Sequence, residues 1–93
     1  MSLAVNTLRP FLLHRIDVGH YAVHLREQPW LLIGHVKIVK AGPDAGLWEA
    51  IVWSERLNRF SARSEATFTC RWEAVGFLAR YRARALAKAK EIA

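Results

Sequence analysis

The stretch that most constrains the fold is the C-terminal segment 70–92, which reads CRWEAVGFLARYRARALAKAKEI. It is the only long segment in which apolar residues recur with helical spacing. Plotted at about 100° per residue, its apolar side chains form one broad arc, made of Ala74, Val75, Leu78, Ala79, Tyr81, Ala85, Leu86, Ala89 and Ile92. A helix with one apolar side needs a surface to cover, so we expect it to pack on a sheet built from the preceding residues.

Three segments upstream alternate apolar and polar residues with a period of two, as half-buried strands do. They are residues 20–26, 30–40 and 47–57, and turn signals separate them at Gln28-Pro29 and in the glycine-rich loop 41–46. Residues 58–66 are polar and predict a turn followed by a loop. Residues 67–69 are a candidate for a short fourth strand. The predicted fold is therefore α+β, with a three- or four-stranded antiparallel sheet packed on one long C-terminal helix.

A chain of 93 residues is the right size for one domain. We divide it into residues 1–17, a β-meander over residues 18–69 and the helix over residues 70–92. The first part contains Pro10, which a first helical turn tolerates, followed by an apolar triplet. It predicts either a short helix or an irregular arm lying against the sheet.

The chain is basic, with 14 Lys and Arg against 8 Asp and Glu, a net charge of +6. A basic excess favours polyanionic partners such as nucleic acid, although it also serves solubility alone. Arg80, Arg84 and Lys88 recur at i, i+4 and i+8 and predict a basic stripe along the exposed side of the helix. Such a stripe can either bind phosphates or remain a solvated surface.

The strand pattern leaves many apolar residues on the sheet face that the helix does not cover. The residues predicted there are Leu31, Ile33, Val39, Ile51 and Trp53, together with His20, His24, Arg26, His35 and Lys37. A solvent-facing sheet surface is normally more polar, so this face predicts an interface. The N-terminal arm, a second copy, a host protein or stacked bases could cover it. For nucleic acid, Arg26, Lys37 and Trp53 are the candidate contacts on this face.

Catalytic and metal-binding patterns are weak. His20 and His24 share a strand face about 13 Å apart, too far to bind one metal ion directly, and the chain has no CxxC or HExxH motif. Cys70, the only cysteine, lies at the predicted start of the helix, where a buried structural role is more common than a catalytic one. We therefore predict a protein without enzymatic activity, metal, cofactor or small-molecule substrate.

A few packing motifs resemble a known group of proteins. They are Ile33-Gly34-x-Val36, Trp48-x-Ala50 and Arg71-x-Glu73-Ala74-Val75. Over roughly residues 20–86, the chain is similar to short, mostly uncharacterised β-β-β-α proteins encoded by actinobacterial phages and their hosts. The resemblance implies the same fold and a phage or mobile-element origin, and it carries over no catalytic residue.

These observations predict a small basic binding module, an accessory protein that contacts nucleic acid through the helix stripe, the open sheet face or both. The alternative is a protein-interaction module, homodimeric or directed at a host protein, that uses the apolar open face. A single cysteine cannot form an intrachain disulfide, and the N-terminal residues lack the pattern of a signal peptide. We therefore expect a cytoplasmic protein, located in the host cytoplasm if a phage encodes it, with no membrane partner.

Overall fold

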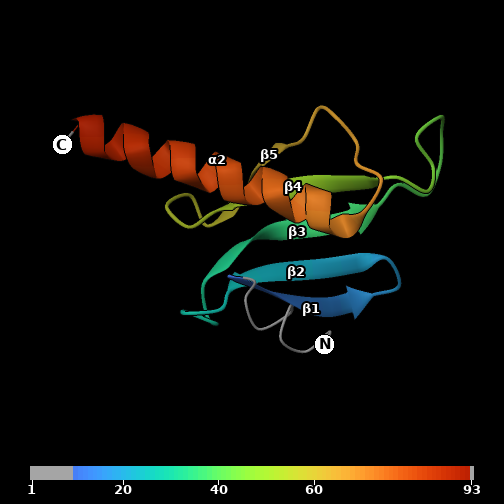
Figure 1. Ribbon diagram of the computed structural model, residues 1–93, viewed down its shortest axis with the longest axis horizontal. Helices are drawn as coiled ribbons and strands as arrows, with labels where there is room; N and C mark the ends of the chain where they lie inside the picture. Colours follow the sequence, from blue (N-terminus) through green and yellow to red (C-terminus); the bar gives the residue numbers. More distant parts are fainter. Residues whose placement is uncertain (1–9, 93) are drawn as a thin grey trace.

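The computed structural model describes residues 10–92 and has two layers, a five-stranded antiparallel sheet and one long helix on a single face of it (Figure 1). The strands follow one another in chain order across the sheet. Their bounds are β1 Phe11–Asp17, β2 His20–Leu25, β3 Leu32–Ile38, β4 Trp48–Ser54 and β5 Arg59–Arg63, and the helix α2 is Arg71–Ile92. The α+β class with a C-terminal helix is confirmed. The sheet has five strands, so the expected count of three or four was wrong.

Strand β1 replaces the arm or short helix expected for the N-terminal part. It pairs antiparallel with β2, from Phe11 opposite Leu25 to Asp17 opposite His20. The tight turn between them is made by Val18, whose N–H donates to the Asp17 side chain at 2.7 Å, and by Gly19, which takes a positive φ of 67°. The apolar triplet 11–13 therefore extends the sheet at its edge instead of lying over its face. The remainder of that prediction, residues 1–9, lies outside the described residues.

Strand β5 occupies part of the segment that the sequence predicted as turn and loop. Asn58, at a positive φ of 52°, ends the turn after β4, and residues 59–63 then pair with β4. Most of β5 is exposed, because it is the edge strand of the sheet and carries arginines at both ends. The expected short strand at residues 67–69 is reduced to a single bridge between Phe68 and Trp48.

A β-bulge at the start of β3 changes which residues face the helix. Val23 lies opposite Gly34 and His24 lies opposite Leu32, so Ile33 is the extra residue between these two pairs. Ile33 is only 6% exposed and belongs to the core, so its predicted place on the open face was wrong. Trp30 precedes the strand in the turn after β2 and is 78% exposed.

The core lies between α2 and the central strands. Its buried side chains come from the sheet and from the first half of the helix: Val23, Ile33, Val36, Ala50, Val52, Ala74, Val75 and Leu78. The predicted apolar arc is thus confirmed for the first two turns of the helix. The second half of α2 extends past the sheet (Figure 1), and the side chains from Ala83 to Lys90 are exposed.

Aromatic contacts fix the beginning of α2 against the sheet. The guanidinium of Arg71, which falls on the apolar side of the helix, lies 5.1 Å from the ring centre of Tyr21. Tyr21 in turn lies 6.0 Å from Trp48, measured between ring centres. The cation–π contact gives this arginine a partner on an otherwise apolar face.

Candidate functional site

The candidate site is the sheet face opposite α2, here called the outer face. Strand pairing places His20, His35, Ile51 and Arg63 on it as neighbours, since residues directly opposite each other in a sheet share a face. Among the described residues no helix lies on this side (Figure 1). Within residues 10–92, the outer face is therefore available to a ligand.

Four rings in contact cross the outer face, and we call them the aromatic row. His20 and His35 have ring centres 4.8 Å apart, His35 and Phe60 are also 4.8 Å apart, and Phe60 and Trp53 are 5.0 Å apart. All three pairs are edge-to-face, the arrangement that the ring quadrupoles favour. Phe60 is the most exposed ring of the row at 43%. The row thus offers a set of ring edges and faces along one line of the sheet.

A polar hollow of about 360 Å³ lies at the His20 end of the row. Its cationic side chains are Lys37, Lys40 and Arg63, and its carboxylates are Asp17 and Glu49. The Arg63 Nε lies 3.8 Å from a Glu49 carboxylate oxygen, a long ion pair on an exposed arginine. Such a pair is weak in water, so Arg63 can exchange Glu49 for another anion at little cost. The hollow, here called the basic hollow, suits a phosphate group.

His35 is held in its neutral form within the row. Burial is the largest cause, and together with the nearby His20, His24 and Lys37 it lowers the pKa of His35 from 6.5 to about 4. Its Nδ1 lies 2.8 Å from the Nε2 of His20, a hydrogen bond in which one ring donates and the other accepts. At neutral pH, His35 is therefore an uncharged ring fixed by its neighbour, and it serves the row as an aromatic surface.

The lowered pKa of His35 predicts an acid-sensitive fold. An unfolded histidine binds its proton near pH 6.5 and folded His35 only near pH 4, so stability should fall as the pH drops from about 6.5 to about 4. The whole pKa shift corresponds to a loss of about 3 kcal/mol in the free energy of unfolding. We expect a loss of about 1–2 kcal/mol because the ring is partly solvated. Urea unfolding of the wild type and of His35→Gln across this pH range measures it. Equal pH dependence in the two proteins would contradict the assignment to His35.

The structure brings together only part of the predicted site residues. Lys37, Ile51 and Trp53 lie on the outer face with the aromatic row. Arg26 follows the other end of β2 from His20, and its N–H donates to the Pro10 carbonyl at 2.8 Å. Arg26 is therefore remote from the basic hollow.

The remaining predicted residues lie elsewhere. Arg80, Arg84 and Lys88 are exposed on α2, which packs on the opposite side of the sheet from the row. Leu31 and Val39 lie just outside the two ends of β3. Val39 lines the basic hollow, whereas Leu31 lines a cavity beside α2, so its predicted place on the outer face was wrong. One ligand on the outer face could not also contact the helix stripe without passing around an edge of the sheet.

Phe60, Lys40 and Arg63 are the contributors to this surface that sequence reasoning missed. Phe60 and Arg63 fall in the segment assigned to a turn and loop. A signal was present, because Phe60 and Ala62 alternate with polar residues directly after Asn58, a residue that tolerates the left-handed turn conformation. Lys40 follows β3, and nothing in the local sequence places it beside His20.

The described part of the chain holds no cluster of metal ligands. Within residues 10–92, no three His, Cys, Asp or Glu side chains gather as metal ligands would. Cys70 is exposed and unpaired by disulfide just before α2. The adjacent Thr69 hydroxyl donates to the Glu73 carboxylate, which lowers the pKa of that carboxyl. This contact joins the residue before the helix to its first turn, as N-terminal capping interactions do.

Comparisons of the chain with known protein families, curated proteins and solved structures find no match. The candidate function therefore rests on the geometry of the outer face. Among residues 10–92, α2 falls short of the apolar character that crossing a lipid bilayer requires, and no other helix is described there.

Proposed function

We propose that the protein is a non-enzymatic module that binds single-stranded nucleic acid on its outer face. The observation that carries the proposal is the aromatic row ending at the basic hollow. Bases stack on aromatic rings whatever their sequence, and cations beside the rings hold the phosphates. Phe60 and Trp53 supply rings at one end of the row, and Lys37, Lys40 and Arg63 supply cations at the other.

Double-stranded nucleic acid suits this surface less well. Bases within a duplex are stacked on each other and present only their edges in the grooves, so flat rings on a sheet have little to stack against. Unpaired bases expose their faces and can lie on such rings. The proposal is therefore for single strands, with the basic hollow as the place of one backbone phosphate.

The protein-interaction alternative has weaker support on this face. Of its five predicted residues, Ile51 and Trp53 share the outer face, whereas Ile33 is buried in the core. Self-association through the outer face stays a prediction, and a light-scattering mass of two chains that falls when outer-face residues are changed would favour it. The resemblance to phage proteins and the cytoplasmic location likewise stay predictions.

The test is the affinity for a fluorescent DNA strand of about 20 nucleotides, its RNA counterpart and the matching duplex. If three cations contact phosphates, the logarithm of the affinity should fall with the logarithm of salt with a slope of about −2. The affinity should then drop about 100-fold between roughly 25 and 250 mM salt. Single strands should bind more tightly than the duplex, and no binding at low salt would refute the proposal.

A matched pair of variants locates the contact. Lys37→Gln with Arg63→Gln removes two charges from the basic hollow and should make the salt slope shallower by about 1.4. Arg80→Gln with Arg84→Gln removes the same charge from the helix stripe and should leave the slope unchanged. If only the helix pair changed the salt slope, the nucleic-acid contact would lie on the helix and not on the sheet.

A further inference from the structure

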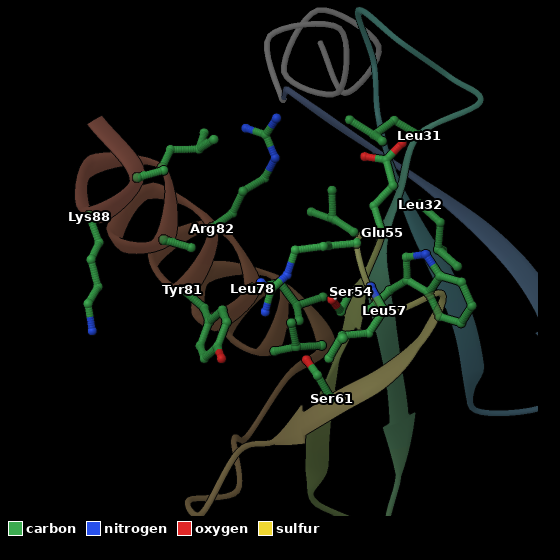
Figure 2. A pocket seen from close by; sticks show the side chains of 17 residues that line it. Leu31, Leu32, Ser54, Glu55, Leu57, Ser61, Leu78, Tyr81, Arg82 and Lys88 are labelled. Carbon is green, nitrogen blue, oxygen red and sulfur yellow. Dashed lines mark hydrogen bonds between the residues drawn. The ribbon is translucent and has the colours of Figure 1, made fainter. Parts of the chain in front are cut away.

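A second and larger cavity lies on the helix side of the sheet. It encloses about 640 Å³ between the second half of α2 and the strands β3, β4 and β5, with the turn after β4 at its rim. Figure 2 shows α2 on one side of it and the strands on the other, with Leu78 and Leu57 between them. We call it the helix groove. Its wall is formed mainly by apolar side chains, among them Leu31, Leu57, Leu78, Tyr81 and Leu86.

Two apolar side chains of the helix groove are largely exposed within the described residues. Leu57 is 45% exposed and Leu86 is 47% exposed, and both line the groove from opposite sides. Beyond Leu78, α2 leaves the sheet and makes no further contribution to the buried core. Helical turns without tertiary packing are marginal in water, so a bound partner would stabilise this part of α2.

The charge around the groove decides what kind of partner fits. Arg56, Arg82 and Lys88 line it, against the single carboxylate of Glu55. The same helix also carries Arg80, Arg84 and Lys90, which do not line the groove. The α2 of a second copy would bring the same positive charges into contact with these, and like charges without counterions oppose association. A partner segment rich in Asp and Glu would instead be attracted to these positive charges.

The dimensions indicate the form of that segment. From Leu78 to Lys90 the helix extends for about 18 Å at 1.5 Å per residue. A partner helix of three to four turns covers this length, and its apolar side chains at i, i+3, i+4 and i+7 would enter the groove. Its acidic residues would then flank the groove beside Arg82 and Lys88.

We infer that the helix groove binds an acidic amphipathic helix from a protein partner. The groove lies on the α2 side of the sheet, whereas the aromatic row lies on the outer face, and Trp53 alone of the row also borders the groove. The inference therefore does not rest on nucleic-acid binding, and each site can fail its test while the other passes. Two functions on two faces would make the protein an adaptor between a single strand and an acidic partner protein.

The test uses the whole protein and a synthetic acidic helix of about 16 residues, with leucine at the four anchor positions and glutamate and alanine elsewhere. Amide NMR shifts should change at Leu57, Tyr81 and Leu86 and stay constant at Phe60. Arg82→Glu with Lys88→Glu should weaken binding about ten-fold or more. The control Arg80→Glu with Arg84→Glu makes the same change of net charge on the same helix. Neither residue lines the groove, so this control should weaken binding by less than about three-fold.

Further measurements separate a specific site from general attraction. A peptide with lysine in place of glutamate, and the acidic peptide with two central prolines, should both leave the groove signals unchanged. Circular dichroism of each protein variant confirms that the fold is retained. The inference would be overturned if the two charge-reversal pairs weakened binding equally, or if the lysine peptide bound as tightly as the acidic one. It would also be overturned if a second copy filled the groove, which a light-scattering mass of two chains would indicate.

Discussion

Replacing Gly34 by alanine is expected to destabilise the protein by about 3 kcal/mol or more. Gly34 lies in β3 directly beneath α2, and a Cβ there would meet the backbone oxygen of Ile51 and the Leu78 side chain, whose Cδ2 would be 2.8 Å away. Leu78 is itself fully buried and the Ile51 oxygen belongs to the paired strand, so neither can move aside cheaply. For a domain of this size, such a loss lowers Tm by about 12 °C or more.

Gly76→Ala is the matched control, since it makes the same chemical change within α2. A Cβ at Gly76 would meet only the end of the Arg80 side chain, at 3.2 Å, and that flexible group can move. Alanine also favours the helix over glycine by about 1 kcal/mol, so this variant should be slightly more stable than the wild type. Thermal unfolding followed by circular dichroism measures both variants. A Gly34→Ala protein as stable as the wild type would show that α2 does not pack this closely on β3.

The two layers could be predicted because strong patterns encode them. Alternation over β2, β3 and β4 and the helical arc through Ala74, Val75 and Leu78 all reflect burial against a common core. The edge strands carry a weaker pattern, since β1 and β5 bury little and pair on one side only. Their formation depends on a neighbouring strand to pair with, which local sequence does not reveal.

The candidate site was predictable only in part for a related reason. The parity of β4 correctly put Ile51 and Trp53 together on the outer face. The bulge beside Ile33 reversed the parity at the start of β3, and a one-residue shift moves a side chain to the other face. Phe60 and Arg63 needed β5 to be recognised first. The aromatic row forms because the register of strand pairing brings its four rings together. It could therefore be recognised only once the pairing of the strands was known.

The largest expected effect on function comes from the exposed end of the aromatic row. Phe60→Ala or Trp53→Ala should each weaken binding of the fluorescent single strand about 10- to 100-fold, because stacking of one base on an aromatic side chain contributes about 1–3 kcal/mol. Trp30→Ala is the control, since Trp30 is highly exposed in the turn after β2 and belongs to no ring contact of the row. It should bind like the wild type. Equal losses from Trp30→Ala and Trp53→Ala would mean that any exposed tryptophan suffices.

The double variant tells whether the two rings hold one base or two. Phe60 and Trp53 are in edge-to-face contact, so removing one also frees the other to move. If both rings enclose the same base, the loss in the double variant should be clearly smaller than the sum of the single losses, since residues in contact couple by about 0.5–3 kcal/mol. If each ring holds its own base, the losses should add. Phe60→Tyr keeps the ring and should retain affinity in either case, so a loss in that variant would point to a change in the sheet itself.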